Sequence, residues 1–320
     1  MNKYLITGFS GFVSEHFLEY LNNKSIMTEV IGLDIEEPTF ETSKFKNINI
    51  LFVKVNLLDK IKVADILSKH TPNFILHLAS FSSVSYSWAN PVESFVNNTN
   101  IFLNLIENIR IQRLKCRILS VGSSEEYGNV TEDLLPLTEE TILNPISPYA
   151  VARVSQEMLS KIYVNNYGLD IVLTRSFNHI GINQKEVFVI PSFIKKILRE
   201  KKLNENLISI NTGNLSIIRD FVDVRDVVAA YDMLFQKGTK GEIYNICSGK
   251  GSTLKSIILI ISNFLKVEVK MVEDTSLFRP DDNKIIIGSF KKIQNTVGWY
   301  PKYSLEESLH VIIKDKITNF

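Results

Sequence analysis

The sequence predicts an α/β fold: a doubly wound parallel sheet followed by a smaller C-terminal α/β region. Short apolar runs suited to buried parallel strands alternate with helical stretches of roughly 10 to 20 residues. The first apolar run ends in glycines and passes directly into an amphipathic helix. The regular alternation lapses after residue 180, so we expect one region at residues 1–180 and another at 181–320. The segment 219–248 could return to the first region.

Charge and composition exclude several classes of protein. The 320 residues include 36 basic and 35 acidic side chains, a formal net charge of +1, so neither a nucleic-acid nor a membrane surface is predicted. Cys116 and Cys247 lie in apolar runs, which predicts buried thiols in a reducing compartment. No uncharged apolar run reaches the ~18 residues of a membrane helix, and the chain starts on a strand rather than a signal peptide. We expect a soluble, cytoplasmic protein without a metal site.

The stretch from Lys3 to Leu21 predicts a strand, a glycine turn and a helix in that order. Such a turn presents backbone N–H groups and the positive end of a helix dipole to a pyrophosphate. Gly8 permits the tight turn, and Gly11 has no Cβ to block the phosphates. Ser14 replaces the third glycine of this pattern. An ordinary strand-to-helix turn is the alternative, but the order of strand, helix and later acid favours a dinucleotide site.

Asp34 closes the second predicted strand, at about the spacing expected for a carboxylate that binds the adenosine ribose hydroxyls. An anion there would repel a 2′-phosphate, so the sequence favours NAD over NADP. The third predicted strand, residues 50–55, ends at Asn56, whose short polar side chain could meet the adenine ring.

The fourth predicted strand, residues 73–79, contains His77, which we interpret as a core histidine rather than a ligand. Small residues follow it, and small side chains at the carboxyl edge of a parallel sheet leave room for a ligand. A long helix is predicted at Pro91–Ile109, with Asn97 and Asn98 on an otherwise apolar face. The small residues are Ala79, Ser80, Ser82, Ser83 and Ser85.

The next strand, residues 116–122, runs straight into Ser123, Ser124, Glu125 and Glu126. Two hydroxyls and two carboxylates at the end of a strand could form the polar floor of a reaction site, and a solvated turn is the alternative.

Tyr149 and Arg153 are predicted to stand one helical turn apart on the same face. Ser147 fits the N-cap of that helix and Pro148 its first position. A guanidinium within reach stabilises a phenolate, so Tyr149 could exchange a proton with a sugar hydroxyl or ketone during hydride transfer. The alternative is a surface pair that stabilises the helix by only about 0.3 kcal/mol.

Two arginines stand out in the second region, Arg219 and Arg279, with Lys195 and Lys196 nearby. The planar fork of arginine suits a diphosphate or a guanine-ribose edge. Solvated side chains are the alternative, since arginines are mostly exposed.

With these residues in hand, the chain resembles the extended short-chain dehydrogenase/reductases that act on nucleotide sugars, over essentially its whole length. Within that family it is most similar to GDP-6-deoxy-D-mannose reductases and more distantly to GDP-mannose 4,6-dehydratases, through the SSEEYG and SFNHIG blocks. The blocks that match in order are TGFSGFVS, LHLAS, SVGSSEEYG, SPYAVAR, SFNHIG, RDFVDVRDVVAAY, YNICSG, RPDDNKIIIGS and GWYPKYSLEESL.

The resemblance implies a Rossmann-type NAD-binding domain and a nucleotide-sugar-binding region, with hydride exchange between C4 of the sugar and the nicotinamide. Ser123 would bind the C4 oxygen, Tyr149 would be the acid/base, and Arg153 falls on the lysine that holds the nicotinamide ribose. The implied catalytic set is Ser123, Ser124, Glu125, Tyr149 and Arg153. The implied NAD contacts are Gly8, Ser10, Gly11, Phe12, Val13, Asp34, Asn56, Leu57, Leu78, Ala79, Ser80, Asn98, Tyr149 and Arg153. The implied substrate contacts are Ser83, Ser85, Glu125, Asn178, Arg219 and Arg279.

Three positions depart from the family pattern. Ser14 replaces the last glycine of the phosphate turn, although a serine can still donate to phosphate. Ser124 stands where many 4,6-dehydratases carry an aspartic acid. The serine at this position weakens the case for dehydration without excluding it. Arg153 keeps a positive charge but cannot deprotonate, so we expect slow but real chemistry.

These features lead us to expect an NAD-dependent oxidoreductase acting at C4 of a GDP-linked mannose or manno-heptose, in surface-polysaccharide precursor synthesis. The direction, 4-keto reduction or 4-hydroxyl oxidation, stays open. A 4,6-dehydratase or 4-epimerase is the second reading, and a non-catalytic NAD-binding protein is the third. The family also implies a homodimer built through the helices at Pro91–Ile109 and Pro148–Tyr167.

Overall fold

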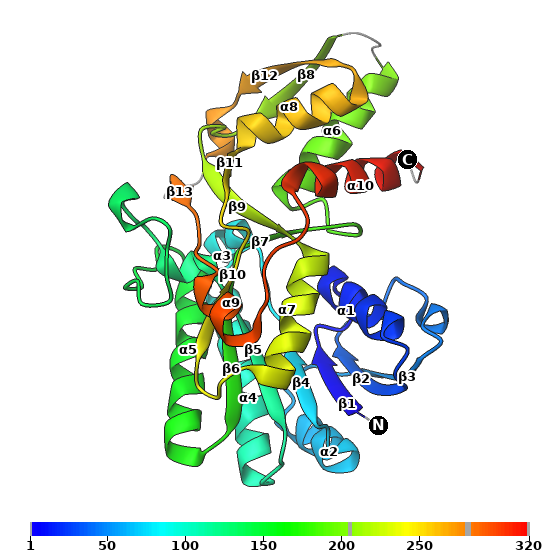
Figure 1. The fold of residues 1–320 in the computed structure, drawn as a ribbon, viewed down its shortest axis with the longest axis vertical. Coiled ribbons are helices and arrows are strands. Elements are labelled where there is room, and N and C mark those ends of the chain that lie inside the picture. The colour runs from blue at the N-terminus through cyan, green and yellow to red at the C-terminus, as the bar shows by residue number, and fades with distance from the viewer. Residues whose placement is uncertain (1, 204–206, 279–282, 319–320) are drawn as a thin grey trace.

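Seven parallel strands form the central sheet of the computed structural model, in the order β10-β6-β5-β4-β1-β2-β3 (Figure 1). The structure describes residues 2–203, 207–278 and 283–318. The strand order reverses between β1 and β4, which is where open α/β sheets bind ligands. The strands are β1 (Asn2–Thr7), β2 (Thr28–Asp34), β3 (Ile48–Lys54), β4 (Phe74–His77), β5 (Arg117–Ser123), β6 (Asp170–Ser176) and β10 (Ile243–Ile246). The prediction of a doubly wound parallel sheet is confirmed.

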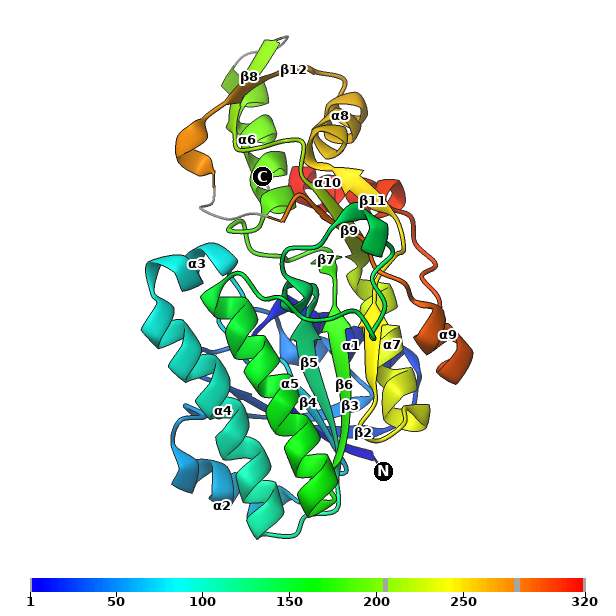
Figure 2. The same ribbon diagram turned by 90° about the vertical axis from the view of Figure 1, so that its left-hand side faces the viewer.

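Helices cover both faces of this sheet (Figure 2). One face carries α1 (Phe12–Asn23) and α7 (Val224–Lys237), with α9 (Lys291–Val297) packed beside α7. The other carries α2 (Lys60–His70), α4 (Pro91–Ile111) and α5 (Pro148–Tyr167). Because both faces are covered, the strands read as nearly continuous apolar runs.

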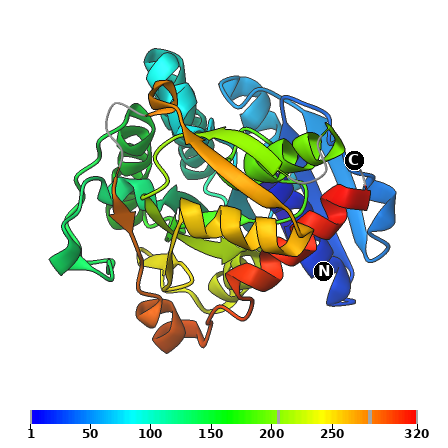
Figure 3. The same cartoon turned by 90° about the horizontal axis from the view of Figure 1, so that it is seen from above.

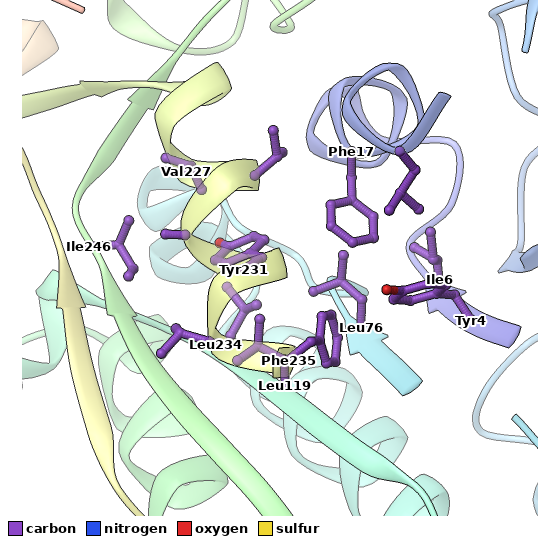
Figure 4. Packing of buried hydrophobic residues seen from close by; sticks show 14 of the residues in the cluster. Tyr4, Ile6, Phe17, Leu76, Leu119, Val227, Tyr231, Leu234, Phe235 and Ile246 are labelled. Carbon is purple, nitrogen blue, oxygen red and sulfur yellow. The ribbon is translucent and has the colours of Figure 1, made fainter. Parts of the chain in front are cut away.

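Alternate residues of a strand supply the two halves of this core. Tyr4 and Ile6 of β1 belong to the cluster under α1 and α7, whereas Leu5 belongs to the opposite cluster. Figure 4 shows Phe17 of α1 and Phe235 of α7 meeting over β1 and β4. The packing of the first of these clusters holds α1, and with it the turn at the N-terminus of α1, against the sheet.

A second lobe sits above the carboxyl ends of the strands, around its own apolar cluster. In the view from above, α8 and α10 lie next to each other across the top of the molecule (Figure 3). Its strands β8 and β12 pair in parallel. The elements are α6 (Val189–Leu203), β8 (Leu207–Thr212), α8 (Leu254–Leu265), β12 (Glu268–Glu273) and α10 (Leu305–Thr318).

A small sheet joins the two lobes. Its central strand β9 (Ile218–Asp223) pairs with β7 (Asn178–Ile180), β11 (Gly251–Thr253) and β13 (Ile285–Ile286). Asp220 of β9 is fully buried and accepts hydrogen bonds from the backbone N–H groups of Ser248 and Gly249, which fixes the turn after β10.

Several short elements are absent from the sequence-based expectation. The N-cap of helix α3 (Val84–Ala89) is Ser83, whose hydroxyl accepts from Tyr86 N at 3.2 Å. Six residues are too few to show helical periodicity, so only the serine cap could have signalled it. Short 3-10 helices occur at η1 (Thr42–Lys44), η2 (Ser124–Tyr127), η3 (Glu132–Leu134) and η4 (Thr275–Leu277).

Three sequence-based expectations about individual residues and segments can be compared with the fold. His77 is fully buried and its Nδ1 lies 2.9 Å from Thr7 Oγ1, as expected of a core histidine. Cys247 is buried as expected, whereas Cys116 is partly exposed. Burial raises the pKa of Cys116 to about 12 and also raises the pKa of Cys247 well above its usual value, so both thiols stay protonated. Within the described ranges, every helix is too short or too polar to cross a membrane.

Candidate active site

A cavity of about 710 Å³ lies at the carboxyl ends of the central strands, between the two lobes. Both lobes line it, and nearly all of the residues singled out from sequence meet there. These are Gly8, Ser10, Gly11, Phe12, Val13, Asp34, Asn56, Leu57, Leu78, Ala79, Ser80, Ser83, Ser85, Ser123, Ser124, Glu125, Tyr149, Arg153, Asn178 and Arg219.

The glycine turn between β1 and α1 forms one end of the cavity. Gly8 has a φ of +69°, and a Cβ on it would lie 2.7 Å from Ala79 N, so the turn excludes a side chain. The N-cap residue of α1 is Gly11, which has no side chain to cap the helix. The buried Ser14 hydroxyl has no hydrogen-bond partner among the described residues. Uncapped backbone N–H groups and a spare hydroxyl at a helix N-terminus fit the pyrophosphate of a dinucleotide.

Asp34 supplies a fixed negative charge beside this turn. Its Oδ2 accepts from Ser10 N at 2.9 Å and its Oδ1 from Ile35 N at 2.7 Å. Glu36 also lines the cavity here. The two backbone donors thus hold the Asp34 carboxylate in one orientation beside the glycine turn.

The end of β5 forms the middle of the cavity wall. Ser123 is the N-cap of η2, and its Oγ accepts from Glu125 N at 3.2 Å. Its backbone N–H donates to the Glu126 carboxylate at 2.7 Å. This capping box holds Ser123, Ser124 and Glu125 at the cavity wall.

Tyr149 and Arg153 meet as the sequence predicts, on the first turns of α5. Ser147 caps the helix through a 3.1 Å bond from Ala150 N. Arg153 Nε donates to Tyr149 Oη at 3.2 Å. Arg153 Nη1 donates to Val121 O at 3.1 Å and to Gln156 Oε1 at 2.6 Å. Since Arg153 is 95% shielded from solvent (5% exposed), its charge faces the phenol directly rather than through water.

A buried charged cluster behind this wall was not predicted. Arg175 of β6 donates to both oxygens of Glu157 on α5, at 2.9 and 3.0 Å. Glu126 Oε2 lies 3.9 Å from Arg175 Nε, and 0% of the surface of Glu126 is exposed. Burial, reinforced by the negative charge of Glu157, raises the pKa of Glu126. The two consecutive acids of SSEEYG were the only sequence signal for it.

The second lobe closes the other end of the cavity. Asn178 of β7 and Arg219 of β9 both line it, and Arg219 Nη1 donates to Asn283 O at 2.6 Å. Arg279 lies outside the described residues. Lys196, noted from sequence near the two arginines, also lines this end. Other residues of this end were not singled out from sequence; they include Phe188, Phe193, Asn211, Asn214, Ile217, Leu254 and Leu277.

Asn98 does not line the cavity, unlike its neighbour Asn97. Its Oδ1 accepts from Phe81 N at 2.8 Å and its Nδ2 donates to Phe81 O at 3.2 Å. A buried amide can satisfy both polar groups of one loop residue, so Asn98 holds the loop at Phe81.

Comparison with known proteins shows the family to which this chain belongs. The model for GDP-mannose 4,6 dehydratase matches residues 5–312. The GDP-6-deoxy-D-mannose reductase of Pseudomonas aeruginosa is 30% identical, over 98% of this chain and 96% of that protein. The GDP-6-deoxy-D-talose 4-dehydrogenase of Aggregatibacter actinomycetemcomitans is 27% identical, over 92% of this chain and 91% of that protein.

Solved structures match over the same length. RMD from Pseudomonas aeruginosa complexed with NADPH has a TM-score of 0.85 at 29% identity, with all of both chains covered (100%). UDP-glucose 4-epimerase of Thermotoga maritima with UDP-glucose has a TM-score of 0.88 at 27% identity, with 99% of each chain covered. The resemblance to extended short-chain dehydrogenase/reductases is confirmed: this chain is an enzyme of the GDP-mannose 4,6 dehydratase family, whose relatives act on nucleotide sugars.

Proposed function

We propose that this protein is an NAD-dependent oxidoreductase acting at C4 of a GDP-linked manno-type sugar, either a hexose or a heptose. The observation that carries the proposal is the Tyr149–Arg153 pair, which faces the same cavity as the glycine turn and Ser123. Two similar proteins, the GDP-6-deoxy-D-mannose reductase and the GDP-6-deoxy-D-talose 4-dehydrogenase, are named for redox chemistry on GDP-linked sugars. Surface-polysaccharide precursor synthesis in the cytoplasm is the setting we propose.

The chain's own residues would handle the proton. The bound nicotinamide would supply or accept the hydride. Ser123 Oγ accepts from Glu125 N, which leaves its own proton for the C4 oxygen of the sugar. Tyr149 would give a proton to that oxygen during reduction or take one during oxidation. Arg153 would stabilise the phenolate through its Nε–H, but a guanidinium cannot pass the proton on.

The nucleotide of the sugar would occupy the second-lobe end of the cavity. Arg219 would bind the diphosphate or the guanine-ribose edge, and Asn178 stands beside it on the neighbouring strand. The most informative experiment is mass spectrometry of the nucleotide released from purified protein, followed by incubation with GDP-sugars. A 4-keto product or its reduction supports the proposal; NAD binding without affinity for GDP-mannose would leave only the non-catalytic alternative.

NAD, rather than NADP, is the cofactor we propose, because Asp34 and Glu36 place negative charge where a 2′-phosphate would sit. Asp34→Asn is expected to lower the preference for NAD over NADP by about tenfold, or ~1.4 kcal/mol. Dissociation constants for both cofactors measure this. Glu37→Gln, an exposed acid outside the cavity, is the matched control. A preference that stays unchanged in Asp34→Asn would show that this carboxylate does not select the cofactor.

Arg153→Lys is expected to raise the turnover number by about tenfold, because a lysine can release and regain the proton that the guanidinium holds. Gln156 Oε1 would lose its 2.6 Å donor, so stability should fall by about 1 kcal/mol. Steady-state kinetics and NAD titration measure both effects. Normal NAD binding with no gain in turnover, together with an unaffected Tyr149→Phe variant, would refute the role given to this pair.

A 4,6-dehydratase or 4-epimerase is the second candidate, since Glu125 also lines the cavity and could act on a sugar proton. Ser124 stands where many dehydratases have an acid that protonates the leaving hydroxyl. In these reactions NAD is regenerated within each turnover. Stoichiometric NADH formation would argue against both, and absence of solvent deuterium at C5 would argue against dehydration.

A homodimer through α4 and α5 is part of the proposal. An apolar groove lies between these helices and the segment before α5, with Val92 at 76% and Val151 at 42% exposure. Exposed apolar surface of this kind favours association. Light scattering of the purified protein tests the dimer. The residues that line the groove are Trp88, Pro91, Val92, Phe95, Val96, Pro145, Ile146, Ser147, Pro148 and Val151.

A further inference from the structure

A buried pair of acids lies between the two elements that carry the proposed reacting groups. Glu126 belongs to η2, directly after Ser123, Ser124 and Glu125. Glu157 belongs to α5, two turns after Tyr149. Both side chains are almost completely shielded from solvent, with 0% and 4% exposed. Neither acid lines the cavity, so their role is not direct contact with ligand.

The described residues around Glu126 and Glu157 do not supply enough hydrogen-bond donors for two ionised carboxylates. Glu126 Oε1 accepts from Ser123 N at 2.7 Å, but its Oε2 is buried and has no donor among the described residues. The Nε of Arg175 is 3.9 Å from that oxygen, too far for a hydrogen bond. Arg175 uses its Nε and Nη2 on Glu157 and its Nη1 on Glu139 O. An orphan carboxylate oxygen in the interior is costly, so a proton is the missing donor.

The charged groups around the two acids also indicate which acid carries the proton. Arg175 is the buried cation facing the pair, and the half-exposed Lys161 reaches Glu157 Oε1 at 3.0 Å from the outer side. The other titratable groups facing the cluster are Glu139, whose pKa burial raises, and Tyr127, whose ring lies 4.8 Å from the Arg175 guanidinium. Burial acts to raise the pKa of Glu157, but its bonds with Arg175 and Lys161 outweigh this and lower it. Glu157 is therefore the ionised member, and Glu126 is the one that keeps a proton.

We propose that Glu126 and Glu157 share one proton. The resulting hydrogen bond holds the Ser123–Glu125 turn against α5, the helix that carries Tyr149. Glu126 is then a positioning residue for the proposed reaction, and the inference rests on that proposed function. Loss of the proton places two negative charges side by side, and their repulsion pushes the turn away from α5. Ser123 and Tyr149 then no longer converge on one substrate oxygen, and turnover falls.

Glu126→Gln is the decisive variant, because its amide imitates the protonated acid. The amide oxygen can accept from Ser123 N, and the amide nitrogen can donate to Glu157 permanently. We expect a turnover number within about twofold of wild type at neutral pH. In the wild type turnover should decline as pH rises through about 8, where the raised pKa of Glu126 lies, and in Glu126→Gln that decline should be absent. Glu140→Gln, an exposed acid on a nearby loop, should behave like wild type.

Two further measurements do not depend on turnover. Infrared spectra at neutral pH should show a protonated carboxylic acid in the wild type and in Glu140→Gln that is missing in Glu126→Gln. Since folding raises the pKa of Glu126 from 4.5 to about 8, the native state binds the extra proton in that range. Its contribution to stability is therefore complete below pH 4.5 and is lost as pH rises to about 8. Glu126→Gln should remove this part of the pH dependence of unfolding.

The outcomes separate the two proposals. An alkaline decline in turnover that is the same in Glu126→Gln and wild type, or the absence of the carboxylic acid band in wild type, would overturn the shared proton. A wild-type protein that turns over no GDP-sugar would overturn the proposed function, while the infrared and unfolding data would still decide the shared proton. Loss of turnover in Glu126→Ala that Glu126→Gln restores would support positioning by the amide or acid.

Discussion

Replacing Tyr149 with phenylalanine is expected to lower the turnover number by about 10²–10⁴-fold while leaving the NAD dissociation constant nearly unchanged. The change removes one oxygen, the atom to which Arg153 Nε donates at 3.2 Å, and leaves the ring in place. Without that oxygen no group at this position can exchange a proton with the C4 oxygen. Steady-state kinetics with a GDP-sugar and an NAD titration measure the two effects.

Tyr163→Phe is the matched control for this variant. Tyr163 lies on the same helix, donates to Glu107 Oε2 at 2.7 Å and does not line the cavity. Its loss should cost about 1 kcal/mol of stability and leave turnover unchanged. If Tyr149→Phe kept wild-type turnover, the proton chemistry proposed for the cavity would be wrong.

The largest loss of stability is expected for Arg175→Met, at about 3–5 kcal/mol. Arg175 is buried and satisfies both oxygens of Glu157, so its removal leaves a buried carboxylate without a partner on that side. The loss should grow as pH rises, because a carboxylate without its cation is best accommodated in the protonated form. Urea unfolding at several pH values measures it.

Arg199→Met supplies the comparison, since Arg199 is an exposed arginine on α6. A change within about 0.5 kcal/mol is expected there. Equal unfolding free energies for the two variants would mean that the buried cluster contributes little to stability.

Local signals in the sequence predicted the parts of the cavity that one element builds alone. The glycine turn, the Ser147 cap and the spacing of Tyr149 and Arg153 each lie within a few residues, and the structure has all three. The order of strands and helices likewise predicted the parallel sheet, because short connections leave few topologies open.

Features that depend on distant residues were not accessible in this way. The meeting of Glu126, Glu157 and Arg175 depends on the packing of η2, α5 and β6, and no spacing along the chain predicts it. The hydrogen bonds between Asn98 and Phe81 were not predicted either, since Phe81 lies in a loop whose path depends on the fold. Strands of two or three residues, such as β7 and β13, are too short to show a period.

The strand that holds Arg219 continues without a break into α7, where Asp223 accepts from Arg225 N at 2.8 Å and caps the helix. That helix is joined to α1, the helix of the glycine turn, through Asp232 and Lys24 and through the packing of Phe235 (Figure 4). These contacts connect the end of the cavity that we propose for the nucleotide of the sugar with the end that we propose for NAD. We therefore expect positive cooperativity: a ligand bound at one end should increase the affinity of the other end for its own ligand.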